Sequence, residues 1–168
     1  KYSYVIDNYL YELGALDSIQ IEEASDDCLK KIADIYMEVG EYGKAVEIYK
    51  RLFGRVSWQP ENVTLGDTDG LNLSFRLATS MKDNGCCQSD IAHTFDSLLL
   101  ANRQHKDYLN MACNTLRAIG IGFNDAQELL SLANKIIARD ESLWSKNPEL
   151  KGIILLTALI DKTTFFSV

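Results

Sequence analysis

Side chains able to do acid–base or nucleophilic chemistry are few in this chain of 168 residues. It contains two histidines, His93 and His105, and neither has a serine or cysteine at the spacing of a nucleophile–base motif. A general acid or base must lie within hydrogen-bonding reach of a reacting group, so isolated histidines offer little catalysis. The sequence therefore predicts no catalytic residue, and an enzymatic function is the least favoured.

The cysteines do not form a metal-binding pattern. Zinc sites use paired ligands separated by short gaps, together with further Cys or His residues, and this chain has no CxxC pair. We expect the thiols to be reduced, with Cys28 and Cys113 acting as small apolar residues on helix faces. No metal and no cofactor is expected. The four cysteines are Cys28, Cys86, Cys87 and Cys113.

Two glycine-containing stretches fall short of known ligand sites. The segment 66–70 places two carboxylates near a glycine, but it lacks the further oxygen ligands and the closing Glu of a calcium loop. We interpret it as a polar turn in which Asp67 or Thr68 caps the next helix. The segment Gly120-Ile121-Gly122 lacks the third glycine and the preceding strand of a dinucleotide site, and is expected to be a loop.

Composition and charge exclude several classes of partner. The chain has 17 Lys and Arg against 24 Asp and Glu, a formal net charge of -7, which disfavours nucleic acid and acidic membrane surfaces. The apolar run 152–156 is too short to span a bilayer, and no signal peptide is visible. We therefore expect an intracellular protein, cytoplasmic or nuclear. Because the chain begins with Lys1 rather than Met, we also expect a fragment of a longer protein.

Apolar residues recur at helical spacing along the chain, and strand signals are scarce. Short connections force neighbouring helices to be antiparallel, so the hairpin is the expected unit. Asp26 is expected to cap the second helix, and Asn124 a later one. The helices are expected near residues 3–16, 26–40, 42–53, 70–82, 88–99, 108–119, 124–137 and 148–163.

One segment carries a more specific pattern of large, small and aromatic residues. Ala33 and Ala45 remove bulk where two helices would cross, and Gly40 supplies a left-handed turn between them. Tyrosines would fill the space beside the alanines. The spacing of these residues resembles that of the tetratricopeptide repeat family, with Leu52 replacing a usual alanine and the closing proline displaced to Pro60. The matching positions are Ile32, Ala33, Tyr36, Gly40, Tyr42, Ala45 and Tyr49.

This resemblance implies an all-α fold of antiparallel helical hairpins, stacked as a short right-handed solenoid. Residues 1–168 would then form a single domain. Residues 26–59 are the clear repeat, and more degenerate repeats are expected at about 70–102 and 106–140. The flanking helices 3–16 and 148–163 would be half-repeats or capping helices.

In that family the first helices of successive repeats line a concave groove that binds a partner. The resemblance implies that the groove of the first two repeats is lined by Asp27, Lys30, Asp34, Met37, Glu38, Asn72, Phe75, Arg76, Thr79 and Lys82. A third repeat, whose register is shifted, would add Lys106, Leu109, Asn110, Cys113 and Arg117.

One subclass of the family binds acidic chaperone tails through a clamp of lysines and asparagines. Lys30 matches one clamp lysine, but Asp34 stands where an asparagine is needed and Arg76 replaces a second one. A carboxylate at Asp34 would repel a tail carboxylate, so no such clamp is expected. The mixed groove suits an amphipathic or extended peptide instead.

The sequence thus favours a non-catalytic protein–protein interaction module, a scaffold segment of a larger intracellular assembly. Its partner would be another protein or peptide. The alternative is a structural domain that mediates self-association, for which an exposed apolar helix at 3–16 would supply the surface.

Overall fold

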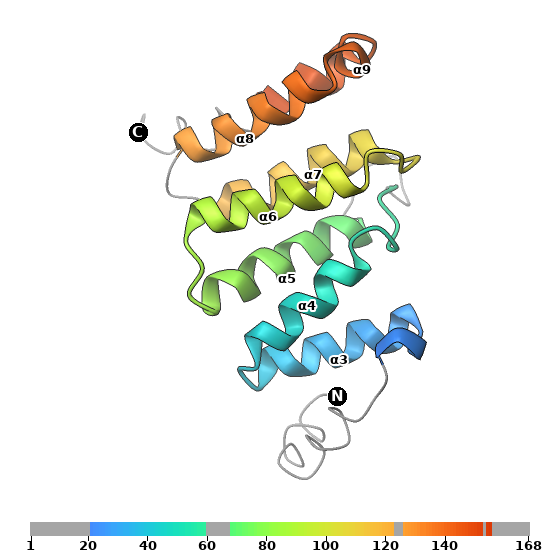
Figure 1. Ribbon diagram of the computed structural model, residues 1–168, viewed down its shortest axis with the longest axis vertical. Coiled ribbons are helices and arrows are strands. Elements are labelled where there is room, and N and C mark those ends of the chain that lie inside the picture. The colour runs from blue at the N-terminus through green and yellow to red at the C-terminus, as the bar shows by residue number, and fades with distance from the viewer. Residues whose placement is uncertain (1–20, 60–67, 123–125, 153, 156–168) are drawn as a thin grey trace.

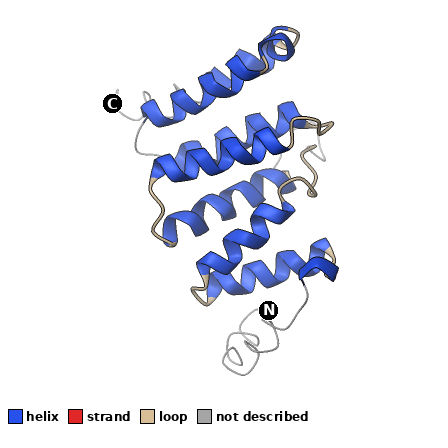
Figure 2. Ribbon diagram, in the orientation of Figure 1, coloured by secondary structure: helices blue, strands red, loops and turns tan. Residues whose placement is uncertain are grey.

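The computed structural model describes residues 21–59, 68–122, 126–152, 154 and 155, and within these residues the chain is helical, with no strand (Figure 2). The prediction of an all-α fold is confirmed. Residues 148–152, 154 and 155 are also helical. The bounded elements are the 3-10 helix η1 (Ile21–Glu23) and the α-helices α3 (Asp26–Glu38), α4 (Tyr42–Leu52), α5 (Asp69–Asp83), α6 (Gln88–Ala101), α7 (Tyr108–Gly122), α8 (Ala126–Arg139) and α9 (Glu141–Ser145).

The helices succeed one another along the long axis of the molecule, from α3 at one end to α8 and α9 at the other (Figure 1). Helix α3 packs against α4, and α4 packs against α5. From α5 onward, helices two apart in the chain also pack together: α5 packs extensively against α7, and α6 packs against α8. The contact between α5 and α7 places residues about 40 positions apart in the sequence on neighbouring surfaces.

The two ends of α3 are formed by local hydrogen bonds. Ser25, rather than Asp26, is the N-cap: its hydroxyl accepts the Cys28 backbone N–H at 3.2 Å. Asp26 already lies within the first turn, where its negative charge is stabilised by the positive end of the helix dipole. At the other end Gly40 has a φ of +83°, as expected for the left-handed residue that ends a helix.

The small residues of the first hairpin lie where the sequence pattern places them. Ala33 and Ala45 are fully buried in the interface of α3 with α4, and Tyr36 and Tyr49 are buried beside them. Tyr42, at the start of α4, is half-buried. Close packing at the alanines therefore sets how near the two helices approach.

The connection after α4 contains a tryptophan that packs into the core. Trp58 is fully buried, donates its Nε1 hydrogen to the Phe53 carbonyl at 3.0 Å, and meets the Phe53 ring edge-on at 4.9 Å. Gly70, in the first turn of α5, lies under this ring and donates its N–H to the Ser57 carbonyl at 2.9 Å. The connection is thus fastened to the beginning of α5.

Two further local features differ from those expected from the sequence. The segment Gly120–Gly122 is the end of α7 rather than a loop, and Gly120 is buried. A glycine costs a helix about 1 kcal/mol relative to alanine, which the packing of α7 against α5 offsets. Helix α9 was not expected, because five residues are too few to show periodicity, yet it carries the fully buried Trp144. The predicted helix 3–16, the predicted cap Asn124 and residues 156–163 lie outside the described residues.

Replacing Gly70 with alanine is expected to destabilise the fold strongly. A Cβ at this position would lie 2.2 Å from the Trp58 ring, closer than any real contact, so the ring or α5 must move. We expect a loss of about 1–3 kcal/mol in the free energy of unfolding, measured by urea denaturation. The matched control is Gly43→Ala in α4, where a Cβ meets only Asn84 at 3.8 Å. That change should be neutral or stabilising, and equal losses in the two variants would contradict the assignment.

Candidate functional site

The residues predicted to face a partner are distributed over α3, α5 and α7, and most of them are accessible. On α3, Lys30 and Met37 are half-buried, and on α5, Phe75 is half-buried. The third-repeat residues on α7 are half-buried, except Cys113, which is buried, and Lys106, which precedes the helix, is exposed. Asp34 is buried with 8% exposure. The exposed members are Asp27, Glu38, Asn72, Arg76, Thr79 and Lys82.

Asp34 contacts other helices rather than lying open on the surface. The Tyr49 hydroxyl donates a hydrogen bond of 2.8 Å to Asp34 Oδ1, and Arg76 Nη1 forms an ion pair with the same oxygen. Burial, followed by the neighbouring Asp34, raises the pKa of Tyr49 well above its ordinary value. One carboxylate therefore joins α3, α4 and α5, with Arg76 as the partly exposed member.

A pocket of about 420 Å³ lies at the junction of α5, α7 and the beginning of α6. Three residues predicted for the groove, Phe75, Thr79 and Lys82, line it. The lining residues that sequence reasoning did not identify are Ala78, Asp83, Cys86, Cys87, Gln88, Ile91, Ala118 and Ile119. We call this feature the α5–α7 pocket.

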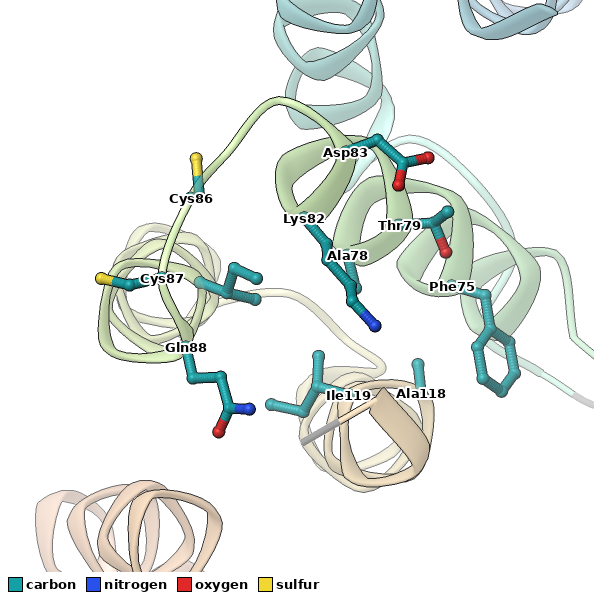
Figure 3. A pocket seen from close by; sticks show the side chains of 11 residues that line it. Phe75, Ala78, Thr79, Lys82, Asp83, Cys86, Cys87, Gln88, Ala118 and Ile119 are labelled. Atoms are coloured by element: carbon teal, nitrogen blue, oxygen red, sulfur yellow. The ribbon is translucent and has the colours of Figure 1, made fainter. Parts of the chain in front are cut away.

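The side chains of the α5–α7 pocket divide into apolar walls and a polar rim. Figure 3 shows the Lys82 ammonium directed into the space between α5 and α7, toward Ile119. The Asp83 carboxylate is directed away from that ammonium. Ala78 faces the space from α5, and Ala118 faces it from α7, where their short side chains leave room. The arrangement can enclose an apolar group while holding one positive charge beside it.

A second polar cluster lies at the far end of the molecule and is structural. Arg139 of α8 forms an ion pair with Asp96 of α6, and Arg103 forms one with Asp140, the N-cap of α9. Burial, and then the nearby Asp140 charge, raise the pKa of Tyr108 to about 12. These contacts hold α6, α7, α8 and α9 together, and the side chains face neighbouring helices.

The residues considered for catalysis or metal binding lie apart from one another in the fold. His93 is exposed on α6, and His105 Nδ1 accepts the Asp107 backbone N–H at 3.0 Å within a turn. Thr68 caps α5, since its hydroxyl accepts the Leu71 N–H at 2.9 Å, as one of the two predicted caps. Over the described ranges, no group of three or more His, Cys, Asp or Glu side chains could hold a metal ion.

Comparison with protein-family models, with curated proteins and with solved structures finds no match to this chain. Within the part of the chain that the structure describes, no helix has both the length and the apolar character needed to cross a membrane. The site is therefore interpreted from its own geometry.

Removing the Asp34 contacts should cost stability through coupled effects. Tyr49→Phe deletes a buried hydrogen bond to a charged group, worth about 1.5–3 kcal/mol. Asp34→Ala deletes the same bond together with the Arg76 pair, so the double variant should cost less than the sum of the single ones. Urea denaturation of the four proteins gives the coupling energy. Tyr42→Phe on the same helix is the control and should have little effect; additive costs would refute the shared contact.

Stability should fall at alkaline pH because of Cys113. This thiol is 8% exposed, and burial raises its pKa to about 12, with Arg117 opposing the shift. The folded protein therefore holds the proton more tightly than the unfolded chain, whose thiols titrate near pH 8.5. The stabilisation is complete below that pH and is lost as pH rises toward 12, at up to about 1.4 kcal/mol per pH unit.

The measurement is urea denaturation of the reduced protein between pH 7 and pH 10. Cys113→Ala should flatten the decline, whereas Cys28→Ala, at a half-buried position, should leave it unchanged. An identical decline in Cys113→Ala would rule out this thiol as its source.

Proposed function

We propose that this chain is a non-catalytic protein-interaction module of the tetratricopeptide type, a scaffold segment of a larger intracellular assembly. Its binding face would be formed by α3, α5 and α7, the first helices of three successive hairpins. A peptide or helix of another protein would lie across that face.

The first support is the hairpin of α3 and α4, where the repeat pattern and the packing agree. The crossing alanines Ala33 and Ala45 are fully buried, and Gly40 has the left-handed backbone that the pattern requires. The second support is the contact of α5 with α7, which keeps alternate helices adjacent as a stack of hairpins does. A continuous face built from alternate helices is the kind of surface that helical-repeat proteins offer to partners.

The observation that carries the proposal is that Phe75, Thr79 and Lys82 line one pocket. The repeat register alone predicts that these three residues of α5 belong to a binding face, and they border the same hollow. Hollows with apolar walls and a few polar groups are the usual places where proteins bind ligands and anchor side chains.

Self-association remains the second candidate. Among the described residues, Leu100 on α6 is the large hydrophobic side chain that is exposed, at 48%. One leucine offers little area against what a stable dimer needs. The apolar helix expected at 3–16 would have to supply the rest, and it lies outside the described residues.

A charge reversal on the proposed face should abolish partner capture. Lys30 lies one helical turn before Asp34 on the stripe of α3 that meets α5, so Lys30→Glu alters this face. Lys31→Glu makes the same change on the exposed neighbouring stripe. We expect partners captured by the wild-type chain from a cell extract to fall at least about tenfold with Lys30→Glu and to be retained with Lys31→Glu.

Quantitative mass spectrometry of the captured proteins measures the difference. Equal capture by both variants would remove α3 from the proposed face. Multi-angle light scattering on the same preparations separates the second candidate, since a dimer that Lys30→Glu leaves intact would favour self-association.

A further inference from the structure

The α5–α7 pocket lies in a region whose local charge is opposite to that of the whole chain. Helix α5 has acidic residues only at its two ends, Asp69 and Asp83, and α7 has none. The same two helices carry Arg76, Lys82 and Arg117. The two helices together thus carry three cations and two carboxylates, a net charge of +1 in a chain whose net charge is -7, and Asp83 lines the same pocket as Lys82.

Of the three cations on α5 and α7, Lys82 alone lines the pocket. Arg76 is paired with Asp34, and Arg117 Nη1 donates a long hydrogen bond of 3.4 Å to Asn114. Lys82 is exposed and forms no ion pair with any residue that the structure describes. Its ammonium is directed into the pocket rather than along the surface (Figure 3). It is therefore the cation available to an incoming group.

The beginning of α6 adds donors to the same rim. Its N-cap is Cys87, whose side chain makes no capping hydrogen bond, so the first backbone N–H groups of α6 are not satisfied by it. Cys87 and Gln88 both line the pocket. Asp90, in the first turn, is exposed and lies outside the lining. The positive end of the helix dipole at the beginning of α6 favours a negative charge beside it, as the Lys82 ammonium does.

The remaining walls are apolar and leave space between small side chains. Phe75, Ala78, Ile91, Ala118 and Ile119 surround a volume of about 420 Å³. Ligand pockets occupy roughly 300–1,000 Å³, so a large side chain and its flanking backbone can be enclosed. Burying an aliphatic or aromatic side chain here would supply the affinity, and the charge would set the orientation.

We propose that the α5–α7 pocket binds a short acidic segment of a partner protein. One large apolar side chain enters between α5 and α7, and an adjacent carboxylate pairs with Lys82 of α5, beside the beginning of α6. This inference rests on the proposed function, because it names the chemistry of the partner at that face. It differs from a carboxylate clamp, which holds charge between lysines and asparagines, since a single ammonium here borders an apolar pocket.

The test uses a pool of acetylated, amidated hexapeptides. Each has Leu, Ile, Met, Phe or Trp at a central position and Asp or Glu at the others. A second pool replaces Asp and Glu with Asn and Gln, and a third replaces them with Lys. Binding to the full chain is followed by NMR chemical shifts. The acidic pool should shift the signals of Thr79, Gln88 and Ile119. It should bind with at least about tenfold higher affinity than the neutral pool, and this affinity should fall with added salt.

Variants of the protein locate the interaction. Lys82→Gln should lower the affinity for the acidic pool about tenfold and leave the affinity for the neutral pool unchanged. Ala78→Trp should prevent binding of both pools by filling the pocket. Lys146→Gln, an exposed lysine after α9, is the matched control and should bind like the wild type. Retained helical circular dichroism shows that each variant is folded.

Several outcomes would overturn the inference. They are no shift with any acidic member, shifts confined to other helices, equal binding of the neutral pool, or tighter binding of the basic pool. If the acidic pool does not bind while Lys30→Glu still abolishes partner capture, the proposed function is supported and the proposed acidic partner segment is wrong. If the pool binds at the pocket while Lys30→Glu changes nothing, the pocket stands and α3 is not part of the binding face.

Discussion

The first three described α-helices depend on one buried carboxylate oxygen. Asp34 Oδ1 of α3 accepts a hydrogen bond from the Tyr49 hydroxyl of α4 and forms an ion pair with the Arg76 guanidinium of α5. A buried carboxylate without partners would cost several kcal/mol, so the three helices must stay in the arrangement that satisfies it. Apolar packing alone tolerates small slides between helices, whereas hydrogen bonds at fixed distances do not. This contact therefore sets the register of α5 against the first hairpin.

The register of α5 in turn determines where the pocket forms. Trp58 packs over Gly70 at the start of α5, and Arg76 fixes the middle of the same helix against α3. With both points held, the stripe of Phe75, Thr79 and Lys82 is left on the side that meets α7. Arg76 lies about 100° around α5 from Phe75 and about 60° from Thr79, so the polar contact and the pocket use adjacent sides of one helix. The contacts of Trp58 and Arg76 therefore help to set the geometry of the pocket.

The sequence predicts the helices well because their cause is local. The periodic stripes of α3 and α4, with Gly40 between them, are complete within about 25 residues. The same local reasoning assigns Gly120 to a loop, because the packing of α7 on α5 that overrides glycine's helix cost is not visible in nearby residues. The pocket is even harder to predict from the sequence. Ala78 and Ala118 become its walls only once α5 and α7 are adjacent, and no period in the sequence pairs them.

The environment of the Asp34 charge also depends on contacts between residues far apart in the sequence. The sequence pattern predicts that Asp34 is exposed to a partner, where its charge would repel acidic tails. In the fold Asp34 forms an ion pair with Arg76 of α5 and accepts a hydrogen bond from Tyr49 of α4. Repulsion by Asp34 therefore no longer argues against an acidic segment; only the missing asparagines argue against the clamp. Since Arg76 is paired with Asp34, the cation of α5 without an ion pair is Lys82, about 1.7 turns further along the helix. The apolar walls beside Lys82 favour an apolar side chain next to a single carboxylate.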